Sequence, residues 1–233
     1  MDSLADTVAV YLDQLWRVIV LSLGANPAAV AVVRASPTSA ALVLGVGALA
    51  GISLLLGQSA VLFANRVSPG RFMLSLGLNA VLNVINLLIW GVTVSVLAWL
   101  LYSISIPIWS ACVIILLGSA PLVFAFLTLL PYLGVPLSWV LEIWSFIIVI
   151  VFLGDLVALT LPQAFVIAVW GWLFIEVLNR ALGDRLGGMR NWIWRTVTGT
   201  RYAEDTRDLV ADVTRRLSGE LAGHSAEHND AAH

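Results

Sequence analysis

Polar and apolar positions are segregated into long blocks along the chain. Residues 72–141 contain no Asp, Glu, Lys, Arg or His, and neither do residues 156–175. A membrane-spanning helix needs about 20 mostly apolar residues to cross a hydrocarbon core of about 30 Å. Residues 147–153 are apolar at every position, whereas strands of a membrane barrel alternate polar and apolar residues. The pattern therefore predicts an all-α, polytopic membrane helical bundle.

These blocks predict about five transmembrane helices. Pro107 opens the third span, and Pro162 stands in the first turn of the fifth, where its missing N–H costs nothing. Pro121 is expected to kink the third span, because it deletes one helical hydrogen bond. A turn at residues 131–136 separates the third span from the fourth, and short connections make consecutive spans antiparallel neighbours. The predicted spans are residues 40–64, 79–102, 107–130, 137–159 and 162–179.

Two amphipathic terminal segments flank the predicted membrane domain of residues 39–180. In residues 1–38, apolar side chains recur at helical spacing between Leu4 and Ile19, with charged positions mostly opposite. Such a helix lies in the membrane interface or packs on the end of the bundle, and the pattern leaves both open. Residues 181–233 start with an Arg-rich juxtamembrane stretch and continue as an amphipathic helix. We expect their polar end to be disordered.

Composition narrows the class further. Hydrophobic residues make up 60 % of the chain and charged residues 11 %, with a net charge of −2. Ordinary soluble domains have about 45–50 % apolar and about 25 % charged residues, so a freely soluble globular protein is excluded. A disordered chain is excluded as well, because such chains are poor in apolar residues. The single cysteine, Cys112, excludes an intrachain disulfide and a cysteine-based zinc site.

Three acidic residues fall inside the predicted spans and are candidate functional groups, since burying a charge in lipid is costly. Glu142 and Asp155 lie near opposite ends of the fourth span, about 20 Å apart along a helix, and cannot form one dyad. Glu176 precedes Arg180 by four residues, the spacing of a local ion pair. Interfacial or packing roles are favoured, and a proton or ion path is the alternative.

The most regular polar feature is on the second span. Asn79, Asn83 and Asn86 fall at positions i, i+4 and i+7, on one face of a helix. In lipid, such amides favour hydrogen bonds between helices, each worth about 0.6–2 kcal/mol. Packing is the favoured interpretation, and the wall of a polar cavity or substrate path is the alternative. On the first span, Gly47 and Gly51 have the spacing that permits a close approach of two helices.

No motif of a known enzyme class stands in the sequence. It contains no Gly-rich phosphate loop, no His-Glu-x-x-His zinc motif and no Gly-x-Ser-x-Gly elbow. No histidine precedes His224, which excludes a catalytic triad or haem ligand within the spans. The membrane already explains the Arg-rich stretch, so nucleic-acid binding has no support. We therefore expect no enzymatic activity, no cofactor and no specific metal site.

Several short motifs along residues 10–180 carry a family resemblance. They are Leu15-Trp16-Arg17, Asn26-Pro27, Ser36-Pro37-Thr38, Arg71-Phe72, Trp90, Ala120-Pro121-Leu122-Val123-Phe124, Pro131-Tyr132-Leu133-Gly134-Val135-Pro136 and Ile143-Trp144. With these motifs the chain resembles the Yip family of multispanning, Ypt/Rab-interacting membrane proteins, in its prokaryotic form. The resemblance implies five helices packed as one unit and a non-enzymatic membrane role. The Asp-Leu-Tyr-Gly-Pro signature of eukaryotic members is not found, so Rab binding does not carry over.

Arginine distribution predicts the orientation in the membrane. On the C-terminal side of the spans lie Arg66, Arg71, Arg180, Arg185, Arg190 and Arg195, whereas only Arg17 and Arg34 lie on the N-terminal side. The positive-inside rule then places the C-terminal tail in the cytoplasm. The predicted function is that of a non-catalytic accessory, scaffold or membrane-organising subunit. Its expected partners are the lipid bilayer and another membrane protein or a second copy. The alternative is a small transporter or channel-like protein using the polar face of the second span.

Overall fold

The computed structural model describes residues 2–58, 69–130 and 132–198, with side chains to residue 181 except at 2–4, 58, 69 and 71. The chain divides into two compact units, Met1–Leu186 and Gly187–His233. The helix packing that follows belongs to the first unit. The predicted amphipathic helix and polar end of the C-terminal segment lie outside the described residues.

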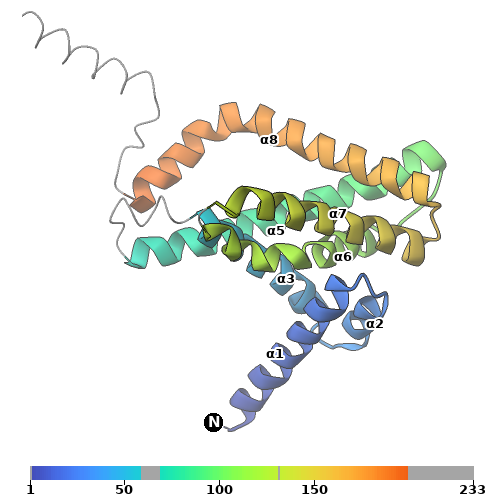
Figure 1. Ribbon diagram of the computed structural model, residues 1–233, viewed down its shortest axis with the longest axis horizontal. Helices are drawn as coiled ribbons and strands as arrows, with labels where there is room; N and C mark the ends of the chain where they lie inside the picture. The colour runs from blue at the N-terminus through green and yellow to red at the C-terminus, as the bar shows by residue number, and fades with distance from the viewer. Residues whose placement is uncertain (1, 59–68, 131, 199–233) are drawn as a thin grey trace, which may run out of the picture. The chain divides into compact units, whose positions relative to one another are not determined.

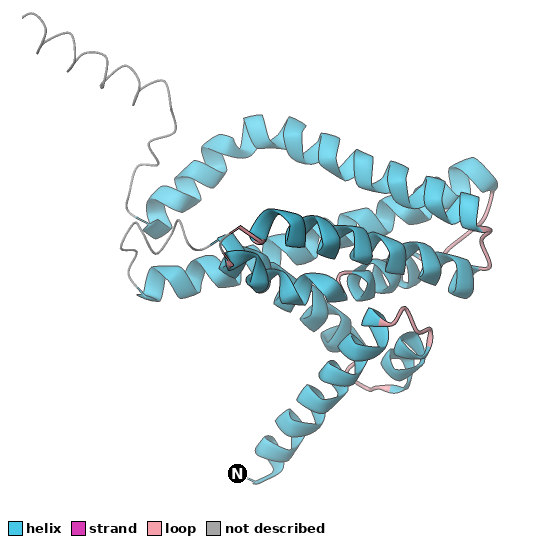
Figure 2. Cartoon of the chain, viewed as in Figure 1, coloured by secondary structure: helices cyan, strands magenta, loops and turns pink. Residues whose placement is uncertain are grey.

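The described part of the chain contains seven α-helices and one 3-10 helix, without a β-strand (Figures 1 and 2). They are α1 (Asp2–Leu23), α2 (Ala28–Ala35), α3 (Ser39–Gln58), α5 (Pro69–Tyr102), α6 (Ile108–Gly118), η1 (Ala120–Leu129), α7 (Gly134–Val157) and α8 (Leu161–Thr198). Five segments are long and apolar enough to cross a membrane: Ser39–Gly57, Phe72–Tyr102, Ile108–Leu129, Gly134–Val157 and Leu161–Ala181. The protein is an all-α helical bundle with five candidate membrane spans, as the sequence predicted.

The second span begins earlier than expected. The prediction started it at residue 79, but α5 begins at Pro69 and its membrane segment at Phe72. Pro69 occupies the first position of the helix, where proline is well tolerated, and the apolar residues that follow continue the helix without a break. At about 1.5 Å per residue, the 34 residues of α5 measure about 51 Å, which exceeds the hydrocarbon core.

Helix α6 and η1 form the centre of the bundle. Residues 111–118 of α6 are all buried, and the pair contacts α1, α2, α3, α5 and α7. In the apolar window of this third span, 61 % of the residues are buried, against 28–39 % in the other four. A helix that is hydrophobic on every side must be enclosed by neighbours or lipid, and here its neighbours enclose it.

Pro121 changes the third span more than a kink would. Helix α6 ends at Gly118, and the chain continues as η1, a 3-10 helix of 10 residues with Pro121 at its start. A proline cannot donate the backbone hydrogen bond that the α-helix needs at this point. The peptide N–H of Phe126 in η1 donates instead to Ser53 Oγ of α3, at 2.8 Å. The neighbouring helix therefore satisfies one of the backbone groups that the change of helix type leaves free.

The second half of helix α1 packs on the end of the bundle. Leu15, Val18 and Ile19 of α1 are buried in the same core as α2 and α6. The Tyr11 hydroxyl donates to the backbone oxygen of Ala41 at the start of α3, at 3.0 Å. The earlier turns of α1 extend away from the bundle (Figure 1) and expose their apolar side chains. Of the two interpretations of this helix, packing on the bundle therefore holds for its second half.

Candidate functional site

The predicted asparagine face of the second span meets the first span. Asn79 Nδ2 donates to the backbone oxygen of Gly51 at 2.5 Å, and Asn83 Nδ2 donates to that of Gly47 at 2.9 Å. The two donors are four residues apart on α5, and the two acceptors are four residues apart on α3. Because the helices run antiparallel, the pairs form two successive rungs, which we call the Asn–Gly ladder.

The α3 side of the Asn–Gly ladder leaves little room for a side chain, least of all at Gly51, where it would meet the backbone of α5. A Cβ atom on Gly51 would lie 2.7 Å from the Cβ of Asn83 and 2.9 Å from the Cα of Ala80. A Cβ on Gly47 would lie 2.7 Å from Leu116 Cδ2 of the central helix. The absence of side chains lets α5 approach closely enough for its amides to reach the carbonyl oxygens of α3. Gly47 and Gly51 thus permit the close approach of two helices that their spacing predicted.

The third asparagine differs from the other two. Asn86 is half-buried, and within the described part of the chain its amide has no hydrogen-bond partner. Two serines that were not singled out from the sequence make helix contacts instead. Ser145 Oγ of α7 donates to the backbone oxygen of Gly118 at 2.7 Å, and Ser53 of α3 receives the η1 contact. Their signal was available, since a hydroxyl within an apolar span needs a partner.

The acidic candidates separate into a pair and a single residue. Glu142 of α7 and Glu176 of α8 lie close enough for their charges to repel one another. Asp155 is exposed near the end of α7, far from both. The spacing of Glu142 and Asp155 along one helix could be read from the sequence. The proximity of Glu176 to Glu142 was not predicted, because it depends on how α7 and α8 are placed in the bundle.

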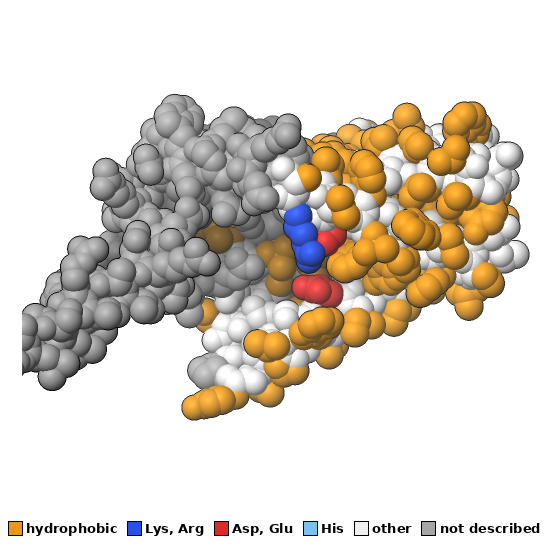
Figure 3. All heavy atoms as spheres, turned by 90° about the horizontal axis from the view of Figure 1, so that it is seen from above, with side chains coloured by type: hydrophobic (Ala, Val, Ile, Leu, Met, Phe, Trp, Pro, Cys, Tyr) orange, Lys and Arg blue, Asp and Glu red, His pale blue; other side chains and the backbone are white. Residues whose placement is uncertain are grey.

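Glu176 and Arg180 form the predicted local ion pair. Arg180 Nη2 and Nε each lie 3.0 Å from Glu176 Oε1. The Arg180 side chain is 80 % exposed and the Glu176 side chain is 39 % exposed. Figure 3 shows acidic and basic side chains gathered together on a face that is otherwise largely hydrophobic. Both residues lie in the last two turns of the fifth candidate span, close to its end at Ala181.

A cavity of about 350 Å³ lies beside Glu142, at the end of the bundle where α3 and η1 end and α7 begins. Its polar lining includes Thr128, Ser138 and Glu142, and its apolar lining comes from α3, η1 and α7. Thr128 and Ser138 both donate their hydroxyls to backbone oxygens three residues earlier in the chain. Glu142 is therefore the one charged group that faces this cavity within the described residues.

The fifth span docks onto the bundle through a narrow aromatic contact. Trp90 of α5 stacks on Phe146 of α7 with ring centroids 6.4 Å apart, and Phe146 meets Phe165 of α8 edge to face at 6.3 Å. A Cβ on Gly171 of α8 would lie 2.9 Å from Trp90 Nε1, so glycine permits this approach. The indole N–H of Trp90 is buried and finds no acceptor within the described residues.

Most of the outer surface of α8 has no neighbour in the described structure. Only 28 % of its apolar window is buried, the lowest share of the five spans. Seven large apolar side chains on the described part of this helix are exposed: Leu161, Phe165, Trp170, Trp172, Leu173, Phe174 and Val177. The predicted juxtamembrane arginines Arg185, Arg190 and Arg195 follow on the same helix, but their side chains lie outside the described residues.

Comparison with known proteins gives no match: neither a family model nor a curated protein nor a solved structure is similar to the chain.

Proposed function

We propose that this membrane protein is a non-catalytic accessory, scaffold or organising subunit that binds another membrane-embedded helix along α8. The observation that carries the proposal is the sparse docking of α8, which exposes a row of large apolar and aromatic side chains. Lipid alone can cover such a surface. Helices in lipid associate through packing and polar contacts, so an open helix face is available to a partner without loss of other contacts.

Family membership and orientation form part of the same proposal. The short motifs that resemble the prokaryotic Yip type favour a five-helix unit with a non-enzymatic role, and the helix count agrees with that expectation. The arginine distribution favours a cytoplasmic C-terminal tail. A partner of α8 would then meet the protein within the membrane, next to a basic segment on the cytoplasmic side.

Site-specific photocrosslinking in native membranes tests the proposed partner face. A photoreactive amino acid replaces Trp172 on the open face of α8, and a matched replacement at Val96 on α5 serves as the control, since both side chains are about half exposed. We expect a discrete higher-mass adduct from position 172 and none from position 96. An adduct of twice the chain mass would identify a second copy as the partner. Equal labelling at both positions, or none at position 172, would contradict the proposal.

A transport function is the second candidate, and the observation that favours it is Glu142, which lines a cavity and lies within reach of the charge of Glu176. The asparagine face no longer adds to this candidate, because Asn79 and Asn83 are engaged with α3. Proton or cation flux into vesicles containing the purified protein tests it. Flux that is present in the wild type and absent in Glu142→Gln would overturn the assignment as an accessory, scaffold or organising subunit in favour of transport.

A further inference from the structure

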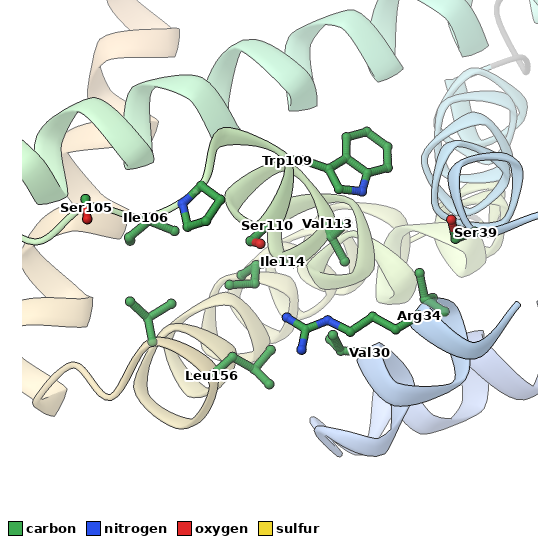
Figure 4. A pocket seen from close by; sticks show the side chains of 13 residues that line it. Val30, Arg34, Ser39, Ser105, Ile106, Trp109, Ser110, Val113, Ile114 and Leu156 are labelled. Atoms are coloured by element: carbon green, nitrogen blue, oxygen red, sulfur yellow. The ribbon is translucent and has the colours of Figure 1, made fainter.

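A second cavity lies at the opposite end of the bundle from Glu142 and takes no part in the proposed function. Its volume is about 470 Å³, and its walls come from four parts of the chain: α2, the start of α3, the connection from α5 into α6, and the end of α7 (Figure 4). The third span begins at Ile108 and the fourth ends at Val157, so the cavity lies where the spans reach the membrane boundary. Lipid headgroups occupy this level of a bilayer.

One arginine supplies the charge of the cavity. Arg34 ends helix α2 and extends across the cavity toward Ser110 and Ile114 of α6 (Figure 4). Among the described residues it has no carboxylate partner, in contrast to Arg180, which is paired with Glu176. No acidic side chain lines the cavity. A guanidinium without a counter-ion at a membrane boundary favours a phosphate group, to which it can donate two parallel hydrogen bonds.

Further donors line the same cavity. The hydroxyls of Ser39, Ser105 and Ser110 are not used in hydrogen bonds to other described residues. Trp109 and Ser110 stand in the first turn of α6, whose N-terminus has no side-chain cap, so its first peptide N–H groups are also free to donate. Trp109 adds an amphipathic ring of the kind that is enriched at membrane interfaces.

We propose that this cavity binds the phosphate of an anionic phospholipid headgroup, with Arg34 as its charged ligand. Inorganic phosphate offers the same charge and acceptor oxygens, but the placement of the cavity at the membrane boundary favours the lipid. The apolar part of the lining, which includes Val30, Val33 and Leu156, suits the glycerol and upper acyl region of a lipid. The cavity is lined by residues 30–157 and uses none of the arginines that follow the fifth span.

Lipid titration of the full-length protein in detergent tests the site. Dioleoyl phosphatidylglycerol, dioleoyl phosphatidylcholine and inorganic phosphate are each added, and the apparent affinity is read from the rise in melting temperature. We expect saturable protection by phosphatidylglycerol and little by the other two. Arg34→Gln should weaken binding of phosphatidylglycerol about tenfold, the factor that corresponds to about 1.4 kcal/mol. Arg34→Lys should retain part of the affinity, because it keeps the charge and loses the planar fork.

Arg17→Gln is the matched control, because Arg17 is an exposed arginine of α1 outside the cavity. Its affinity for phosphatidylglycerol should equal that of the wild type, and its unliganded melting temperature gives the baseline for losing one arginine. Equal weakening by Arg17→Gln and Arg34→Gln would overturn the site, since it would indicate general charge attraction. Equal protection by inorganic phosphate or by phosphatidylcholine would overturn the assignment to an anionic lipid.

Discussion

The three asparagines of the second span show how one residue type takes different roles along one helix face. Asn79 and Asn83 each donate to a glycine carbonyl of α3, whereas Asn86 has no such partner among the described residues. A side-chain amide inside an apolar span retains its desolvation cost whether or not it is paired. The stabilising contribution of the Asn–Gly ladder therefore belongs to its two rungs and not to the face as a whole.

Replacing the asparagines one at a time should separate these roles. Asn83→Leu removes one rung and should lower the free energy of unfolding in detergent by about 1 kcal/mol. Asn86→Leu is the matched control, with the same chemistry one turn along the helix, and should change stability little or increase it. Thermal unfolding in one detergent, followed by circular dichroism, measures both. Equal losses in the two variants would show that the ladder hydrogen bond carries no specific stability.

At the scale of the helices, glycine decides which pairs of elements come into close contact. The α3–α5 contact depends on Gly47 and Gly51, and the α5–α6 contact depends on Gly91, where a Cβ would lie 2.7 Å from the Cα of Cys112. Gly77 on α5 is different, because a Cβ there would meet nothing within 4 Å. Glycines within one span therefore have opposite structural consequences according to the face they occupy.

Alanine substitution should reveal this contrast directly. Gly51→Ala places a methyl group against the backbone of α5, which cannot move aside cheaply, and should destabilise the bundle by about 1–3 kcal/mol. Gly77→Ala meets open space and should stabilise α5 by about 0.5–1 kcal/mol, through the helix propensity of alanine. Melting temperatures of the two purified variants should move in opposite directions. A Gly51→Ala variant as stable as the wild type would show that α3 and α5 can separate without cost.

Elements and local spacings could be predicted from the sequence, whereas contacts between distant helices could not. Long apolar blocks fix the five spans, and the spacing of four residues fixes the Glu176–Arg180 pair, because both depend only on neighbours in the chain. The meeting of Glu142 with Glu176 and the cavity around Arg34 each require several helices to converge. The early start of α5 was not predicted, although residues 72–78 carry no charge and allow the helix and its membrane segment to begin before residue 79.

At the scale of the whole molecule, five candidate spans predict that the two ends of the chain lie on opposite sides of the membrane. The cavity around Arg34 would then face the side of the N-terminus. The cavity beside Glu142 would face the side on which the fifth span ends. The six arginines on the second side favour the cytoplasm there. The two cavities would consequently be exposed to different aqueous compartments and to different leaflets.

Cysteine labelling of intact cells tests this orientation. The native Cys112 is buried, so an introduced cysteine reports its own position. With a membrane-impermeant maleimide, Ser225→Cys should be labelled only after lysis, whereas Ala5→Cys, at the other end of the chain, should be labelled in intact cells. The reverse pattern would invert the assignment. Labelling of both positions in intact cells would place both ends on one side and contradict an odd number of spans.

The 3-10 segment in the third span is longer and more tightly wound than an α-helix of the same ten residues would be. Ten residues of 3-10 helix rise about 20 Å, whereas ten residues of α-helix rise about 15 Å. Each 3-10 residue also turns the chain by about 120°, against about 100° in the α-helix. Conversion of η1 to α-helix would thus retract the connection to α7 by about 5 Å and rotate it by about 200°.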